Sequence, residues 1–193
     1  VNPAPVQVFY NPFPEDQLLT ALQAIESGGP STAPTNPVTT YISIAAVANG
    51  TIIYYDQWEN GYDTDIANPT NVYSSPGNLG GTQIWGDGNT ANGAPPGVPS
   101  DLINAGTVII LNNDVTTTNL SAIDFDGRDK IAATKGVAVS HTAWAAGSGT
   151  LLAGSVEVYD TSYWGTDYRA PVGEDIPTAT DHDMFQYTSL SIQ

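Results

Sequence analysis

Short runs of β-branched and aromatic residues, each ended by Gly, Pro, Asn or Asp, set the strongest limit on what this chain can fold into. Such runs are typical of β-strands, and the turn residues between them leave little room for long helices. The expected strands are 6–10, 39–48, 51–56, 82–85, 107–111, 130–134, 137–141, 151–159 and 185–192. Many short strands separated by turns predict an all-β fold, mainly an antiparallel β-sandwich of the jelly-roll kind.

One segment near the N-terminus has helical rather than strand periodicity. Within residues 15–27, Leu18, Leu22 and Ile25 fall on one helical face. Pro14 precedes this segment and a pair of glycines follows it, as expected at the two ends of a short helix. We therefore expect one short N-terminal helix.

The chain divides where the Pro, Ser, Thr and Gly linker 28–37 ends. Residues 1–37 are expected to form an arm, the short helix and the linker, and residues 38–193 the β-sandwich-like domain. Segment 6–10 lies within the arm, and its sequence is compatible with either an edge strand or an extended arm.

Turn chemistry predicts one hairpin and two long loops. Asn49-Gly50 is typical of a two-residue hairpin turn, so the strands on either side of it are expected to pair. The stretches 59–82 and 86–104 are rich in Asn, Gly, Pro and Asp. Loops of this length are usually either functional or disordered. Embedded aromatic residues such as Tyr62 and Tyr73 favour order in these loops.

The charge of the chain excludes several classes of partner. There are 20 acidic residues and four basic ones, which gives a net charge of -16. Phosphates would be repelled, so nucleic acid and anionic membranes are not expected as partners. No run approaches the roughly 18–20 apolar residues of a membrane span, and we expect no membrane insertion. The four basic residues are Arg128, Lys130, Lys135 and Arg169.

Composition also points to a compartment. The chain contains no Cys, which excludes disulfides and thiolate metal sites, and it is poor in Lys but rich in Thr, Asn and Gly. This is typical of a secreted or cell-surface bacterial protein. The chain starts Val1-Asn2-Pro3 without Met, so we expect a processed form whose signal peptide has been removed.

Clustered aspartates suggest calcium sites in the loops. Ca²⁺ takes six to eight oxygen ligands, which Asp, Asn and backbone carbonyls supply. The candidate ligands are Asp63, Asp65, Asn68, Asp87, Asp124, Asp126 and Asp129. Each group has an alternative without metal. The first three residues can form an Asx turn, Asp87 can lie in a packed turn between two glycines, and the last three can pair with Arg128 and Lys130.

Aromatic residues near the same loops suggest two further sites. Trp58, Tyr62, Tyr73 and Trp85 are candidates for an aromatic platform that binds carbohydrate. Asp56 and Glu59 flank Trp58, and a glycoside hydrolase needs two carboxylates in such a cleft. Because proximity in sequence does not establish the required separation in space, we rank hydrolysis last.

A series of motifs resembles a known type of module. The motifs are YYDQWENGY at 54–62, IWGDGN at 84–89, NAG at 104–106, DGRDKIAATK at 126–135, LLAGSVEVYD at 151–160, WGTDY at 164–168 and PVGED at 171–175. In this order, over most of residues 38–193, they resemble the N-terminal module of large secreted bacterial surface proteins, which is distantly similar to the IgG Fc-binding-protein N-terminal domain. The resemblance implies a β-rich extracellular building block for adhesion, surface coating or fibre assembly, followed by further sequence. It carries over no catalytic residues.

Together these observations predict an extracellular structural or adhesive surface subunit that is not an enzyme. It would associate with itself or with other surface proteins through an edge strand, either 6–10 or 188–193, with calcium ordering its loops. A carbohydrate-binding module is the alternative, with glycans as partners.

Overall fold

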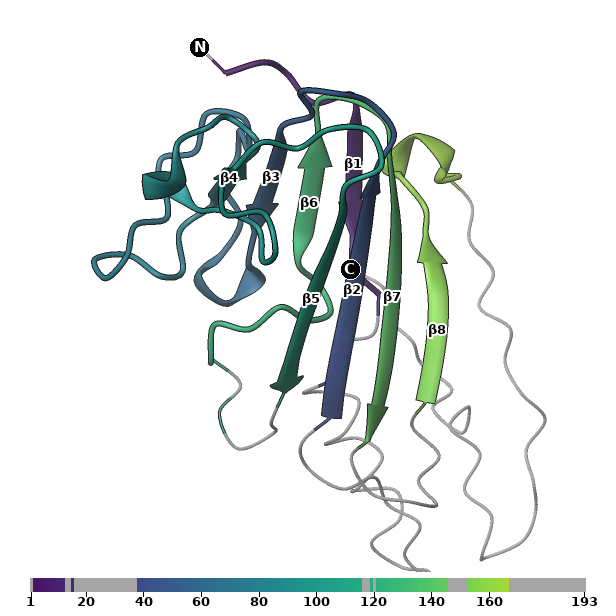
Figure 1. The fold of residues 1–193 in the computed structure, drawn as a ribbon. Coiled ribbons are helices and arrows are strands. Elements are labelled where there is room, and N and C mark those ends of the chain that lie inside the picture. The colour runs from purple at the N-terminus through teal and green to yellow at the C-terminus, as the bar shows by residue number, and fades with distance from the viewer. Residues whose placement is uncertain are drawn as a thin grey trace, which may run out of the picture.

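The computed structural model describes residues 2–12, 15, 38–115, 119, 121–145 and 153–166 (Figure 1). Within these residues the chain forms two antiparallel sheets of four strands each, which confirms the predicted all-β sandwich. The strands are β1 Gln7–Tyr10, β2 Val38–Ala46, β3 Ile53–Asp56, β4 Gln83–Trp85, β5 Val108–Val115, β6 Lys130–Ala133, β7 Val137–Ala145 and β8 Ala153–Val158. The 3₁₀-helices are η1 Trp58–Asn60, η2 Thr90–Asn92 and η3 Thr161–Tyr163.

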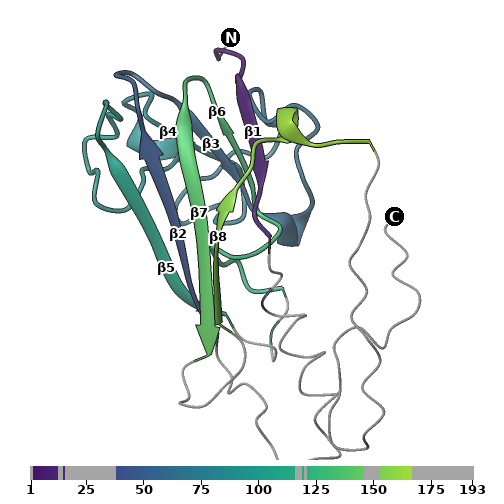
Figure 2. The same ribbon diagram turned by 90° about the vertical axis from the view of Figure 1, so that its right-hand side faces the viewer.

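The two sheets form the two layers of the sandwich (Figures 1 and 2). Sheet A has the strand order β1-β6-β3-β4, and sheet B has the order β5-β2-β7-β8. Segment 6–10, for which the sequence left two possibilities, contains the edge strand β1, which pairs with β6. Its Phe9 lies in the core, so the sandwich begins inside the segment predicted to be the arm.

The predicted hairpin at Asn49-Gly50 is wrong. The turn exists, with Gly50 at a φ of 63°, but it leads the chain from sheet B to sheet A. β2 is bonded to β5 on one side and to β7 on the other, so neither of its edges is left for β3. The turn residues are right for a sharp reversal, and pairing is decided by strands much farther along the chain.

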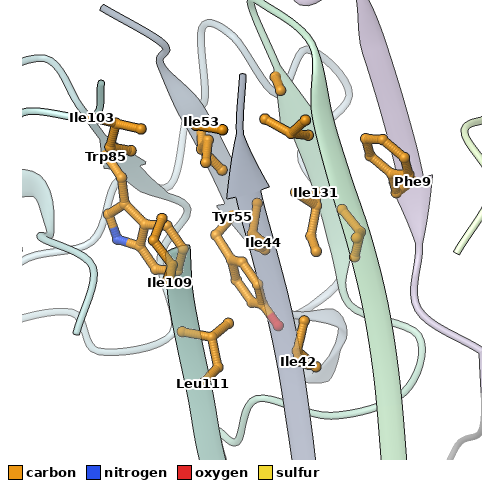
Figure 3. Close-up of a cluster of buried hydrophobic side chains, with 14 of the residues drawn as sticks. Phe9, Ile42, Ile44, Ile53, Tyr55, Trp85, Ile103, Ile109, Leu111 and Ile131 are labelled. Atoms are coloured by element: carbon orange, nitrogen blue, oxygen red, sulfur yellow. The ribbon is translucent and has the colours of Figure 1, made fainter. Parts of the chain in front are cut away.

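The core lies between the two sheets and receives side chains from every strand named above (Figure 3). β2 shows how the sequence produces it, because buried and half-buried residues alternate along the whole strand. Ile42 and Ile44 of β2 face Tyr55 of β3, whose ring stacks on Trp85 of β4 at a centroid distance of 5.1 Å. The ring of Phe125 meets Tyr55 edge-on at 5.2 Å.

The outer face of sheet A is buried as well. Ile66 and Ala67, from the long loop after η1, pack on Tyr54, Ile84 and Ala132 of the sheet. All four residues of β3 are therefore buried. The prediction that loop 59–82 is ordered is thus confirmed, and the reason is this second apolar cluster.

Two predicted elements fall outside the described residues. Of the helix expected at 15–27 only Glu15 is described, and the strand expected at 185–192 is not described. In the described part of the chain, no helix has the length and hydropathy needed to cross a membrane.

Candidate functional site

The first predicted calcium loop is held together by hydrogen bonds within the chain. Asp63 is buried, and its carboxylate accepts hydrogen bonds from the backbone N–H and the hydroxyl of Thr70, at 2.9 and 2.8 Å, and from the hydroxyl of Thr82 at 2.8 Å. Burial opposes ionisation, but these hydrogen bonds prevail and lower the pKa of Asp63. The exposed Asp65 accepts from Ala67 N and Asn68 Nδ2 instead. Asp63 therefore has other partners than Asp65 and Asn68, which bond to each other, and Asp65 forms the Asx turn named as the alternative by accepting from Ala67 N.

Asp87 is likewise engaged by nearby amides. Its exposed carboxylate accepts from Asn89 N at 2.8 Å and from Asn92 Nδ2 at 2.9 Å. The loop around it is anchored by Asp101, a fully buried residue that the sequence analysis did not single out. Asp101 accepts from three backbone N–H groups, those of Gly86, Gly88 and Asn89. No local pattern marks Asp101, because its partners lie at least 12 residues away.

The fold does bring Asp126 and Asp129 together. Both are buried, and Asp129 accepts a 2.5 Å hydrogen bond from the hydroxyl of Tyr55 and a 3.1 Å bond from the N–H of Asp126. Burial raises the pKa of Asp129 well above its usual value, and the charge of Asp126 adds to the rise. Trp58 Nε1 donates to Asp126, while burial raises the pKa of Asp124. This turn is tied to the core through Tyr55.

No metal site emerges among the described residues: no group of three or more His, Asp and Glu side chains there is arranged to hold an ion. Calcium stays a prediction, and Asp126 and Asp129 are two predicted ligands that lie close enough for the charge of one to act on the other.

The two carboxylates suggested for hydrolysis accept hydrogen bonds from other parts of the chain. Asp56 is 1% exposed, and its two oxygens accept from Asp63 N at 2.9 Å and from the Thr82 hydroxyl at 3.1 Å. Glu59 accepts from the N–H of Asp124 at 3.3 Å. Asp56 thus fastens the long loop to sheet A, and it is too deeply buried to reach a substrate in this arrangement.

The predicted aromatic platform does not form as a unit. Trp85 is fully buried in the core and donates from Nε1 to Gln83, so its assignment to a ligand platform is wrong. The reason is that β4 turns Trp85 toward sheet B. Trp58 and Tyr73 are partly buried, and Tyr62 is 44% exposed.

A different aromatic surface lines a cleft beside the edge strands β1 and β8. The cleft has a volume of about 620 Å³, and its lining includes Phe9, Val139 and Val158 of the core. Tyr163 and Trp164 lie on its wall. It forms because β8 stops pairing with β7 at Val158, after which the chain crosses toward β1 through η3 (Figure 2).

Three aromatic side chains of this wall are exposed to solvent. Tyr163 is 78% exposed, Tyr159 is 62% and Trp164 is 49%. Asp160 shapes the segment, because its buried carboxylate caps η3 by accepting from Ser162 N at 2.7 Å. The polar residues Gln7 and Glu157 also line the cleft.

The aromatic surface continues from the cleft across β1. The Trp164 ring lies 5.8 Å from that of Tyr10, which contacts Tyr62 edge-on at 5.6 Å. The ammonium group of Lys130 lies 5.9 Å from the ring centroids of both tyrosines. We call the run of Trp164, Tyr10 and Tyr62 the aromatic belt.

Sequence analysis missed Tyr159 and Tyr163 as site residues and used Trp164 only for the family resemblance. A signal was present, since three aromatic residues occur within six positions directly after a strand. Comparisons of the chain with protein-family models, with curated proteins and with solved structures found no match.

Proposed function

We propose that this chain is a non-catalytic adhesive module of an extracellular surface protein, and that it binds carbohydrate in the cleft beside β1 and β8. The observation that carries the proposal is the exposure of Tyr159, Tyr163 and Trp164 around one cleft. Exposed apolar residues that occur singly need no explanation, whereas a group of them at a concave site marks a binding surface.

The chemistry of the cleft suits a sugar. One face of a pyranose ring consists of C–H groups, which pack well on the flat rings of Tyr163 and Trp164. The sugar hydroxyls then need hydrogen-bonding partners, and the lining of the cleft includes Glu157 and Gln7, although the amide oxygen of Gln7 already accepts from Val137 N at 2.7 Å.

The extracellular part of the proposal is supported by composition. The chain contains no Cys, has only two Lys, and carries a net charge of -16. The resemblance to the N-terminal module of secreted bacterial surface proteins points in the same direction and remains part of the proposal. Adhesion to a glycan is a role that such a module can perform without catalytic residues.

A glycan array, followed by calorimetry on the oligosaccharides that bind, tests the proposal. Tyr163→Ala and Trp164→Ala are expected to weaken binding at least about tenfold, as exposed aromatic anchors of binding sites commonly do. Tyr73→Ala is the matched control, because Tyr73 belongs to the platform that the sequence suggested and does not line the cleft. Loss of binding in Tyr73→Ala alone, or an array without any bound glycan, would refute the proposal.

Self-assembly through an edge strand is the second candidate function. β5 is an edge strand of sheet B, and its outward-facing Val108 and Ile110 are 54% and 47% exposed. An exposed edge with apolar side chains can pair with a strand of another chain. Sedimentation velocity should show concentration-dependent association that Ile110→Lys abolishes and that Val47→Lys, at an exposed position outside the strands, preserves. A monomer at all concentrations would exclude this function.

Calcium binding is a further part of the proposal that can be tested separately. Ca²⁺ at the Asp126 and Asp129 turn should raise the melting temperature relative to a chelator, and the effect should vanish in Asp129→Asn. Identical melting curves with Ca²⁺ and with chelator would exclude a calcium-ordered loop.

A further inference from the structure

Two of the few cations in this acidic chain lie next to the aromatic belt, Lys130 against its rings Tyr10 and Tyr62 and Arg128 against the neighbouring Trp58. Arg128 and Lys130 are separated by one residue at the start of β6, and the side chains of both are partly exposed. Within the part of the chain that the structure describes, neither forms an ion pair with a carboxylate. Lys135 differs, because its ammonium group donates to the backbone carbonyl of Asn49.

Aromatic rings hold both cations in place. The guanidinium of Arg128 lies 4.2 Å from the ring centroid of Trp58, and the Lys130 ammonium lies 5.9 Å from the rings of Tyr10 and Tyr62. The hydroxyl of Tyr62 donates to the backbone carbonyl of Arg128 at 2.6 Å. The two cations therefore border the belt that begins at Trp164 in the cleft.

The nearest carboxylates are mostly buried beneath this surface. Asp56 lies opposite Lys130 in the pairing of β3 with β6, but it is 1% exposed and its oxygens are occupied by hydrogen bonds. Asp126 and Asp129 are also buried, at 2% and 0% exposed. Asp65 is exposed and close enough for the charge of Lys130 to help lower its pKa, and Glu59, next to Trp58, is partly exposed. The solvent-facing surface here presents cations and aromatic rings, with most of the negative charge below it.

The charges next to a bound ligand, rather than the net charge of the chain, decide whether a single carboxylate on that ligand is attracted. Solvent-exposed charges are largely screened beyond about 10 Å at 0.1 M salt. A densely charged polyanion would still meet the net charge of -16 along its length. A single carboxylate held against Arg128 would meet a planar guanidinium that can form two parallel hydrogen bonds with it.

We propose that Arg128 and Lys130 form an anion subsite that extends the cleft, so that the preferred carbohydrate is a mainly neutral oligosaccharide bearing an isolated uronic acid. The sugar would stack on the rings of the cleft and belt, and its carboxylate would contact the two cations. This inference rests on the proposed function, because it concerns the same carbohydrate ligand and states that one part of it carries a carboxylate.

The test compares oligosaccharides that differ only in one carboxylate. The probes are xylo-oligosaccharides with and without a single glucuronic acid branch, and cello-oligosaccharides with and without one oxidised C6, measured by calorimetry and fluorescence. The acidic member of a pair should bind about fivefold more tightly at low salt, as expected for an exposed ion pair, and the preference should disappear near about 0.5 M salt. The salt titration uses the unmodified protein.

Variants then locate the preference. Arg128→Gln and Lys130→Gln should bring the acidic and neutral probes of each pair to equal affinity. Lys130→Arg should keep the preference, which shows that charge at this position is what matters. Lys135→Gln is the matched control, since it removes the same charge at a site that makes no contact with the belt.

Three outcomes would overturn the inference. Equal binding of both members of every pair at low salt would remove the subsite and leave carbohydrate binding intact. A preference lost in Lys135→Gln as well would show that net charge rather than a subsite is responsible. Failure of every probe to bind would overturn the subsite, and a silent glycan array beside it would overturn the proposed function too.

Discussion

Two segments of the molecule share a local design and have opposite surroundings. β3 ends in Tyr55-Asp56 and is followed closely by η1, and β8 is followed by Tyr159-Asp160 and η3. β3 lies inside its sheet, between β6 and β4, whereas β8 is the last strand of its sheet. Tyr55 is fully buried, while Tyr159 is 62% exposed. The same arrangement therefore builds the core at one place and a solvent-exposed aromatic surface at the other.

The aspartates of the two segments differ in the same way. Asp56 accepts hydrogen bonds from Asp63 and Thr82, 7 and 26 residues away, and so holds a long loop against sheet A. Asp160 accepts from Ser162, two residues away, and shapes only η3. The difference teaches that neighbouring strands, rather than local sequence, decide whether such a segment is buried in the fold or faces solvent.

Trp85→Ala is expected to cause the largest loss of stability, and it tests the contrast between the buried and the exposed segment. Trp85 is fully buried against Tyr55, so its truncation leaves a cavity and should cost about 3–5 kcal/mol of unfolding free energy. Trp164→Ala, in the exposed segment, should change stability by less than about 0.5 kcal/mol. Urea denaturation followed by circular dichroism measures both values. Similar losses in the two variants would contradict the assignment of Trp85 to the core and Trp164 to the surface.

Asp56→Ala is expected to cause the second largest loss of stability. It leaves the N–H of Asp63 and the hydroxyl of Thr82 without this acceptor, at a site that is fully buried. A cost of about 1–3 kcal/mol is expected for such a loss. Hydrogen exchange should show the greatest increase in loop 59–82. Uniform exchange, with loop 59–82 no faster than the strands, would disprove the role of Asp56 as the fastener of this loop.

The interior segment also brings a pH dependence through Asp129, the carboxyl group that accepts from the hydroxyl of Tyr55. Burial raises the pKa of Asp129 well above its usual 3.8, so the folded protein keeps a proton that the unfolded chain loses. The contribution of Asp129 to stability is complete at pH values below its pKa in the unfolded chain. It is lost as the pH rises through its pKa in the folded protein. Asp129→Asn keeps an acceptor for Tyr55 without a charge, so the variant should gain stability relative to the original protein as pH rises.

Asp63 provides a control, because its pKa is shifted in the opposite direction to that of Asp129. Despite burial, the hydrogen bonds from Thr70 and Thr82 lower its pKa, so its stabilisation is present above pH 3.8 and is lost as pH falls through the folded value. The destabilisation caused by Asp63→Asn should therefore shrink in acid. Denaturation curves collected across the acidic and neutral range test both variants. Stability differences that do not change with pH would contradict both assignments.

The same contrast explains what the sequence could predict. The sandwich was predictable because strands such as β2 alternate strictly between buried and half-buried positions. β5 extends beyond the predicted end at residue 111, because its polar residues 112–114 pair with β2 and contribute hydrogen bonds such as that from Thr39 to Asp114. Such polar residues carry no strand pattern of their own.

The site was harder to predict because burial depends on contacts between distant segments. Trp85 and Trp164 both occur beside Gly and Asp in the sequence, yet only the first is covered by the opposite sheet. The loop aspartates have suitable chemistry for calcium, but folding supplies Asp63 and Asp87 with hydroxyl and amide partners. Composition identifies candidate residues, and strand order decides which of them face solvent.

Asp160→Ala is expected to have a smaller effect on stability than Trp85→Ala or Asp56→Ala, and it is the sharpest test of the exposed segment. Loss of a capping carboxylate costs about 0.5–2 kcal/mol, and the lower end is expected here because η3 has only three residues. The effect on the cleft should be larger than the effect on the fold, since Asp160 holds the turn that presents Tyr163 and Trp164. Carbohydrate affinity should therefore fall while the urea midpoint barely moves, and Asp160→Asn, which keeps an acceptor for Ser162 N, should restore affinity. If Asp160→Ala instead unfolded the protein as Trp85→Ala is expected to, η3 would be part of the core, and the contrast between the two segments would not hold.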